Sequence, residues 1–96
     1  MPLKASQKKN LRGKAHHLKP LVTVADKGLS ESVVAEIERA LFDHELIKVK
    51  LRADREQRKA WAESIAQQCQ AELIQTIGQT ACFYKRHPDK PVINPG

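Results

Sequence analysis

Two short histidine-containing sequences come nearest to catalytic or metal-binding chemistry in this chain of 96 residues. His16 and His17 are adjacent, and neighbouring residues on a helix point about 100° apart, so their rings cannot readily hold one metal ion together. No third ligand has a recognisable spacing, which argues against a metal site. His44 precedes Glu45, and a histidine beside a carboxylate can support acid–base catalysis. We interpret this second pair as a solvated loop or a helix-end contact.

The other candidates for catalysis or cofactor binding form no pattern. Cys69 and Cys82 lie outside any CxxC arrangement, so we interpret both as small buried or half-buried side chains in a reducing compartment. Ser30 is explained as a helix cap. The sequence has neither a phosphate-binding loop nor a dinucleotide fingerprint. We therefore expect no catalytic residue, no cofactor, no metal and no small-molecule substrate.

The clearest signal is the distribution of charge. Residues 1–25 contain six basic residues and no acidic one, whereas eleven basic residues face eleven acidic ones from residue 26 onward. The net charge of +6 is therefore confined to the first quarter of the chain. A localised positive region attracts polyanions through a long-range field that salt screens, and nucleic acid is the commonest such partner.

Hydrophobic periodicity predicts the order helix, strand, helix, strand, helix, strand, strand. The helices are expected at residues 6–18, after Ser30 and after Asp54, and the strands at residues 21–25, 47–52, 73–77 and 81–85. Strand–helix–strand units favour right-handed parallel crossovers, and the final hairpin adds an antiparallel edge. The prediction is a small α/β domain with a four-stranded mixed sheet, whose later two helices cover one face.

The domain is placed at residues 3–86, because a chain of this length builds one modest core. Three prolines break regular structure beyond that point, so residues 87–96 are expected to form a Pro-rich, mobile C-terminal tail. No apolar run is long enough to cross a membrane, and no apolar segment follows the N-terminal charges. These observations predict a cytoplasmic protein that does not bind a membrane.

The first helix is the strongest candidate for nucleic-acid binding. Leu11, Ala15 and Leu18 are expected to form a narrow apolar seam, with basic residues stacked along another side. The candidate contacts are Lys8, Lys9, Arg12, Lys14, Lys19, Lys27, Gly28, Lys85 and Arg86. A further basic row, Lys48, Lys50 and Arg52, fits a solvated strand face and a nucleic-acid contact about equally well. Because aromatic residues are few, recognition should depend on phosphates and shape.

Several sequence motifs, in this order, closely resemble the CRM domain family and its stand-alone bacterial YhbY type. They are LRGKAHHLKP (11–20), GLSESV (28–33), HELIKVKL (44–51), IGQT (77–80) and FYKR (83–86). The resemblance covers residues 3–86 and implies a fold similar to the C-terminal domain of translation initiation factor three. It also implies RNA binding without catalysis. Because bacterial members are associated with precursors of the large ribosomal subunit, it implies ribosomal RNA as the partner and a role in subunit assembly.

The family usually carries a GxxG loop between the first strand and the second helix. The matching residues here are Ala25, Asp26, Lys27 and Gly28, so the second glycine is kept and the first is alanine. Alanine allows less positive φ and a less close approach of a phosphate than glycine does. Asp26 also places a negative charge beside Lys27. We therefore expect the first helix to contribute more to RNA binding than this loop.

Three alternatives remain open at the level of sequence. The first is a duplex DNA-binding, chromatin-type protein, because this architecture alone does not separate DNA from RNA. The second is an RNA-processing enzyme that uses His16 or His44. The third is an adaptor that binds a ribosomal protein through its exposed helix faces. The sequence does not indicate an oligomeric state.

Overall fold

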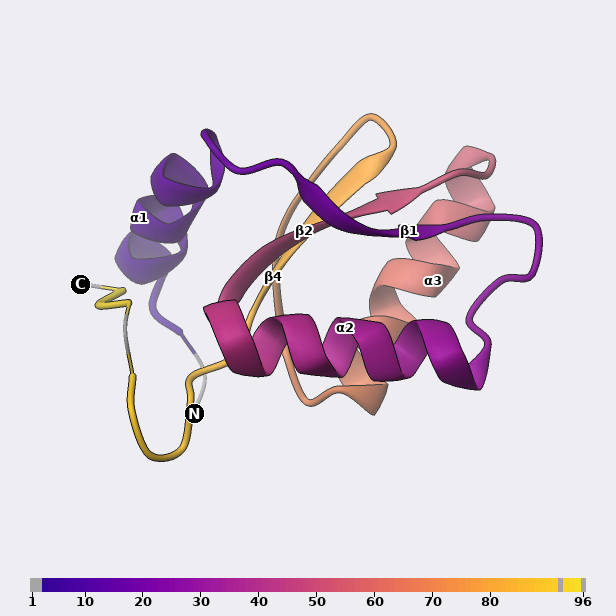
Figure 1. The fold of residues 1–96 in the computed structure, drawn as a ribbon. Coiled ribbons are helices and arrows are strands. Elements are labelled where there is room, and N and C mark those ends of the chain that lie inside the picture. Colours follow the sequence, from indigo (N-terminus) through magenta and orange to yellow (C-terminus); the bar gives the residue numbers. More distant parts are fainter. Residues whose placement is uncertain (1–2, 92, 96) are drawn as a thin grey trace.

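The computed structural model describes residues 3–91 and 93–95. Helices and strands follow each other in the predicted order (Figure 1). The elements are α1 (Ala5–Ala15), β1 (Pro20–Val24), α2 (Glu31–His44), β2 (Leu46–Leu51), α3 (Arg55–Gln68), β3 (Glu72–Ile77) and β4 (Thr80–Tyr84). Each strand begins and ends within one residue of its predicted position. Within the described part of the chain, no helix has the length and apolar character needed to span a membrane.

The sheet has the strand order β1-β2-β4-β3. β1 and β2 run parallel, with α2 connecting them, whereas β4 runs antiparallel to both of its neighbours. The mixed sheet and the antiparallel edge that the hairpin adds were predicted, whereas the position of β4 inside the sheet, between β2 and β3, was not. The connection through α3 places β3 one strand position away from β2. The tight turn at Gly78, where φ is +55°, then returns β4 into that gap.

The main hydrophobic core lies between one face of the sheet and helices α2 and α3, as predicted. The side chains of Ile47, Val49 and Leu51 alternate along β2 and are almost completely buried. They pack with Ile37 of α2 and Ile65 of α3. Alternate residues of a strand point to opposite faces, so the intervening residues of β2 face the other side of the sheet.

The two core helices begin at the predicted capping residues. The Oγ atom of Ser30 accepts a hydrogen bond from the backbone N–H of Val33 at 3.3 Å. The Oδ1 atom of Asp54 accepts one from the backbone N–H of Gln57 at 2.8 Å. These bonds satisfy donors that have no partner within the first turn of a helix. The caps confirm the predicted starting points of α2 and α3.

Helix α1 packs on the opposite face of the sheet. Its Leu11 and Ala15 are fully buried and cluster with Leu46 of β2 and Tyr84 of β4. The prediction that Leu18 continues this seam was wrong, because α1 ends at Ala15 and Leu18 is 37% exposed. The backbone N–H of Leu18 bonds to the carbonyl of Ala15 in a turn, since the approaching proline disfavours a continued helix.

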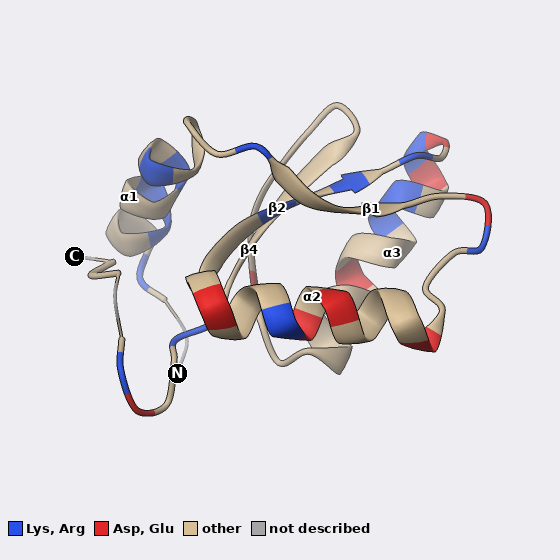
Figure 2. Ribbon diagram, in the orientation of Figure 1, with Lys and Arg blue, Asp and Glu red and all other residues tan. Residues whose placement is uncertain are grey.

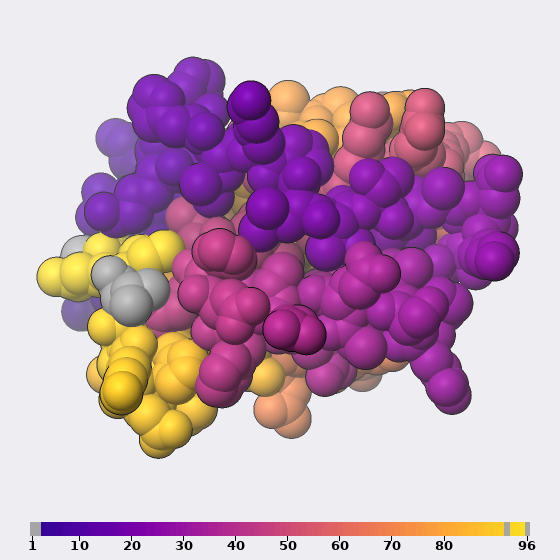
Figure 3. Space-filling view, viewed as in Figure 1, coloured from indigo at the N-terminus to yellow at the C-terminus, as the bar shows by residue number. Residues whose placement is uncertain are grey.

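The described residues after Arg86, at positions 87–91 and 93–95, form neither helix nor strand, but they are attached to the domain. The buried carboxylate of Glu45 accepts hydrogen bonds from the backbone N–H groups of His87 and Ile93, each at 2.7 Å. The side-chain amide of Asn10 in α1 donates to the carbonyl of Pro95 at 3.2 Å. Figure 3 shows this segment (yellow) packed beside α1 (indigo). The expected mobile tail is therefore docked where it is described, and positions 92 and 96 lie outside the described residues.

Candidate nucleic-acid interface

Helix α1 carries basic side chains around its buried seam. Lys8 and Arg12, one turn apart, are half-buried beside the seam, while Lys9 and Lys14 are exposed. None of these four forms an ion pair with a carboxylate in the described part of the chain. The positive charge of α1 is thus not neutralised within the molecule, and its field remains available to a polyanion.

The two flanks of α1 face different surroundings. Gln7 and Asn10 lie on the flank that meets the C-terminal segment, because Gln7 lines a cavity there and Asn10 bonds to Pro95. Residues on a helix are separated by about 100° each, so Arg12 lies about 160° around the helix from Asn10. Lys8 and Arg12 therefore lie on the flank away from the C-terminal segment.

The face of the sheet that α1 covers also carries basic residues. Lys48 and Lys50 alternate with the core residues of β2, so they point to the side of the sheet on which α1 packs. Both are half-buried, and they pair in register with Cys82 and Thr80 of β4. The sequence left open whether this row is a solvated strand face or a contact surface. The fold places it on the same side of the sheet as the basic helix.

The other side of the molecule has a different charge. The exposed surface of α2 carries Glu36, Glu38 and Asp43, and Figure 2 colours the acidic positions of this helix red. Arg39 lies among them and pairs with Asp43 at 3.9 Å. A polyanion would be repelled by the surface of α2 and attracted to the side with α1. The charge asymmetry seen along the sequence is therefore also an asymmetry between two faces of the fold.

The loop at residues 25–28 is separated from α1. It follows the far end of β1, whose five residues span about 17 Å at about 3.3 Å each (Figure 1). The backbone N–H of Arg52 bonds to the carbonyl of Val24 at 2.8 Å, so Arg52 lies beside this loop. The structure thus does not bring Lys27 and Gly28 together with the basic residues of α1.

Gly28 itself adopts a φ of +63°, a conformation that suits glycine. A Cβ atom at this position would lie 3.8 Å from the ring of Trp61, which is an ordinary contact distance. Trp61 is half-buried against the main core beneath this loop. The glycine is therefore required by the backbone conformation and not by lack of space.

The remaining residues predicted to contact RNA lie near the two ends of α1. Lys19 is exposed in the connection between α1 and β1. Lys85 and Arg86 are exposed directly after β4 and line a cavity together with Leu3 and Gln7. They are thus near the beginning of α1, on the flank that carries Gln7 and not the flank of Lys8 and Arg12.

The histidines considered for catalysis are exposed side chains. The rings of His16 and His17 meet edge to face, with centroids 5.4 Å apart. His44 is exposed, whereas Glu45 is fully buried and its carboxylate binds the backbone of the C-terminal segment. Of the two interpretations of this pair, the structure supports the helix-end contact for Glu45, which caps the end of α2 with its backbone N–H bonded to the carbonyl of Leu41, and not the solvated loop. In the described residues, no three His, Cys, Asp or Glu side chains gather closely enough to hold a metal ion.

The two cysteines are buried, as predicted, and lie on opposite faces of the sheet. Burial raises the pKa of the Cys69 thiol, the charge of Glu38 raises it further, and Lys85 partly lowers it. Burial also raises the pKa of Cys82, and Lys48 partly opposes this shift. Both thiols are therefore protonated at neutral pH and are poor nucleophiles.

The sequence of this chain matches a known protein family over most of its length. The model of the CRS1/YhbY (CRM) domain matches residues 3–85. The chain belongs to this family. The resemblance inferred from the ordered motifs is thereby confirmed, and α1, the sheet and both core helices all lie inside the matched CRM domain.

Related CRM domains come from distant bacteria. A protein of Pseudomonas aeruginosa named "Probable RNA-binding protein" is 48% identical over 89 residues, which cover 92% of this chain and 86% of the relative. A protein of Bacillus subtilis with a similar name is 37% identical over 92 residues, covering 95% of this chain and 96% of the relative.

A solved structure has the same fold. The solution structure of a Staphylococcus aureus protein, described as a candidate RNA-binding protein, superposes with a TM-score of 0.84 at 29% identity. The superposition covers 97% of this CRM domain chain and 98% of the other. The predicted small α/β fold with a mixed sheet is therefore confirmed.

Proposed function

We propose that this CRM domain binds RNA through α1 and the neighbouring basic face of the sheet. Its target is ribosomal RNA in the cytoplasmic precursor of the large ribosomal subunit, whose assembly it assists without catalysis. The single observation that carries the proposal is the unneutralised basic surface of α1, which lies on the same side of the sheet as Lys48 and Lys50. The names of the relatives as RNA-binding proteins support RNA as the polyanion.

The chemistry of this surface favours contacts to phosphates. Lysine and arginine side chains on a helix can neutralise backbone phosphates, which fixes position and orientation on the nucleic acid but carries no sequence information. The described surface of α1 offers basic, amide and small side chains and no aromatic ring for stacking apart from His16. Recognition through α1 is therefore expected to depend on the shape of a folded RNA.

A charge-reversal experiment tests the surface. We expect Lys8→Glu with Arg12→Glu to lower affinity for structured RNA at least tenfold and to flatten the dependence on salt by about one unit of slope per lost phosphate contact. The matched control is Arg39→Glu with Lys59→Glu, which changes the charge equally on the α2 and α3 side of the fold. Equal affinities and slopes for the folded α1 variant and the unmodified chain would reject the proposed surface.

The identity of the RNA requires a separate experiment. Crosslinking of the full chain in cells, followed by sequencing of the attached RNA, should enrich ribosomal RNA of the large-subunit precursor. Predominant recovery of transfer or messenger RNA would reject the ribosomal target while leaving RNA binding intact. Competition with duplex DNA of equal length should displace little structured RNA, and equal competition would favour a general nucleic-acid binder.

A further inference from the structure

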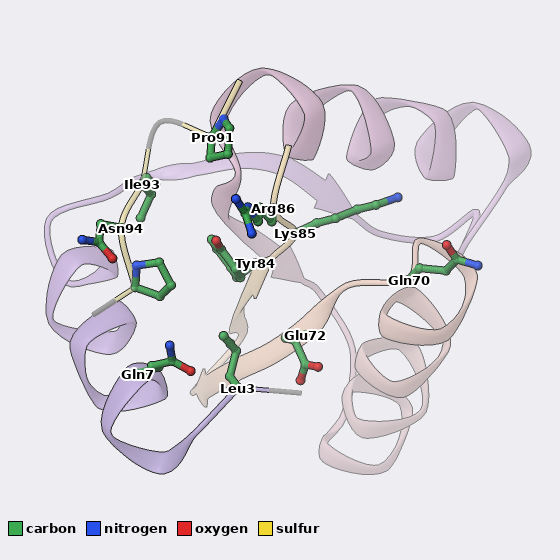
Figure 4. Close-up of a pocket in the computed structure, with 11 residues that line it drawn as sticks. Leu3, Gln7, Gln70, Glu72, Tyr84, Lys85, Arg86, Pro91, Ile93 and Asn94 are labelled. Atoms are coloured by element: carbon green, nitrogen blue, oxygen red, sulfur yellow. The ribbon is translucent and has the colours of Figure 1, made fainter. Parts of the chain in front are cut away.

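A cavity of about 730 Å³ lies between the beginning of α1, the sheet and the C-terminal segment (Figure 4). Its volume is within the range of about 300–1,000 Å³ that is typical of small-molecule sites. Its walls come from the beginning of the chain, the start of β3, the end of β4 and the C-terminal segment, represented by Gln7, Glu72, Tyr84 and Ile93. The cavity is separate from the flank of α1 that carries Lys8 and Arg12.

One part of the cavity is apolar. Tyr84 lies at its centre in Figure 4, with Ile93 and Pro91 of the C-terminal segment on one side and Leu3 below. The ring of Tyr84 is almost wholly buried, and burial together with the charge of Glu45 raises its pKa, which Arg86 partly lowers. The phenol is therefore a neutral, fixed wall at neutral pH. The accessible apolar surface comes from the half-buried side chains of Leu3 and Ile93 and from the exposed Pro91, and it suits the flat face of a nucleobase.

The rim of the cavity is polar and carries both signs of charge. Lys85 and Arg86 follow Tyr84 directly, and the guanidinium of Arg86 lies beside the Tyr84 ring in Figure 4. Glu72 lies at the lower edge, beside Leu3. The guanidinium of Arg86 fits a phosphate group, whereas the side chain of Lys85 points away from it in Figure 4. A carboxylate such as that of Glu72 accepts hydrogen bonds from exocyclic amines of bases. Charge and shape together therefore match a nucleotide.

The cavity is formed in advance because the C-terminal segment is held in place. Glu45 anchors this segment through the backbone N–H groups of His87 and Ile93, which flank the stretch containing Pro91. Asn10 bonds to the carbonyl of Pro95 and attaches the same segment to α1. A wall fixed at three points lowers the ordering cost of binding a ligand.

We propose that this cavity binds one unpaired nucleotide of the target RNA. The inference rests on the proposed function and adds a second contact to it, for a base that has left the stack. Arg86 binds its phosphate, the base lies against Leu3 and Ile93, and Glu72 accepts a hydrogen bond from an exocyclic amine. Adenine, guanine and cytosine carry such an amine and are favoured, whereas uracil, which lacks one, is the weakest ligand.

The first test uses mononucleotides as probes of the isolated contact. Titration of the isotopically labelled full chain with the four nucleoside 5′-monophosphates should shift the backbone amide signals of Gln7, Glu72, Arg86 and Ile93. We expect uridine monophosphate to bind at least threefold more weakly than the others. Shifts confined to α1 and β2, with these four signals unmoved, would overturn the proposal.

Variants then test the two polar groups. Arg86→Ala should weaken all four monophosphates at least fivefold, whereas Glu72→Gln should reduce the difference between uridine and cytidine monophosphates. Arg39→Ala on α2 is the matched control, because it removes an exposed arginine from the other side of the fold. Unchanged affinity for the folded Arg86→Ala variant would overturn the phosphate assignment, and retained discrimination in Glu72→Gln would overturn the amine assignment.

A pair of RNA hairpins, identical except for one bulged adenosine, distinguishes a nucleotide within RNA from a free one. The unmodified chain should bind the bulged hairpin at least fivefold more tightly, and Arg86→Ala should lose this preference. Equal affinity for both hairpins would overturn the proposal even if free monophosphates bind. The variant Lys8→Glu with Arg12→Glu should bind both hairpins weakly yet keep its monophosphate shifts. The proposal for the cavity and the proposal for the α1 surface are therefore rejected by different measurements.

Discussion

The carboxylate of Glu45 accepts a hydrogen bond from the backbone N–H of Ile93 at 2.7 Å, across 48 positions of the sequence. Glu45 directly follows α2, is fully buried, and adopts a φ of +63°, which costs about 1–3 kcal/mol for a residue other than glycine. Its backbone carbonyl also accepts a hydrogen bond from the N–H of Lys85 at 2.9 Å. One residue thus joins the end of α2, the end of β4 and the C-terminal segment.

Replacement of this carboxylate should release the C-terminal segment. In Glu45→Gln, only one side-chain oxygen remains for the N–H groups of His87 and Ile93, and a buried donor without an acceptor costs about 1–3 kcal/mol. We expect the free energy of unfolding to fall by about this amount and the Ile93 amide to exchange hydrogen faster. Glu38→Gln, an exposed change on α2, is the control. Unchanged protection of Ile93 would show that Glu45 is not the anchor.

Charge reversal on β2 should weaken RNA binding independently of α1. Lys48→Glu with Lys50→Glu places two carboxylates on the face of the sheet that carries α1, where they would repel phosphates. We expect affinity for structured RNA to fall at least tenfold and the salt slope to flatten. Filter binding at several salt concentrations measures both. Affinity equal to that of the Arg39→Glu, Lys59→Glu control would assign the β2 row to a solvated strand face.

Alanine at position 28 should affect stability more than RNA binding. The φ of +63° costs a residue with a Cβ about 1–2 kcal/mol, while the space beside Trp61 is sufficient. We expect Gly28→Ala to lower the free energy of unfolding by about 1 kcal/mol, measured by Trp61 fluorescence in urea. Its loss of RNA affinity should be smaller than that of Lys8→Glu with Arg12→Glu. A larger loss in Gly28→Ala would identify the loop as the principal contact.

Stability should decline at alkaline pH. The native state binds the thiol protons of Cys69 and Cys82 more tightly than the unfolded chain does, because burial raises both pKa values above their ordinary value of 9.0. Tyr84 is shifted in the same direction from 10.0. The stabilisation is therefore complete below about pH 9 and is lost as the pH rises through the native pKa values. Urea titrations between pH 7 and pH 11 measure this decline, and a constant free energy of unfolding would contradict it.

Thiol chemistry provides a direct check of the same burial. Both cysteines should react slowly with a thiol-specific reagent at pH 8 in the native chain and rapidly in urea. Their positions in different clusters, on opposite faces of the sheet, also predict that mild oxidation forms no bond between them. Rapid native-state labelling of either residue would contradict its place in the core.

Features that depend on neighbouring residues were predicted from the sequence. The alternation of Ile47, Lys48 and Val49 indicated a strand with two chemically different faces, and Ser30 and Asp54 indicated where helices begin. These signals are local, because strand periodicity and helix capping involve residues at most a few positions apart. The concentration of positive charge in the first quarter of the chain was equally visible, since it requires only counting.

Features that depend on distant pairing were decided by the tertiary structure. The strand order places β4 inside the sheet. Long-range packing places α1 on the face with Lys48, and the length of β1 separates Lys27 from Arg12. The burial of Glu45 could not be predicted either, because its partners lie 42 and 48 residues further along the chain. Sequence by itself determined the elements, their caps and the basic helix. Only the three-dimensional fold determined which face they share, because long-range packing and buried hydrogen bonds leave no local pattern.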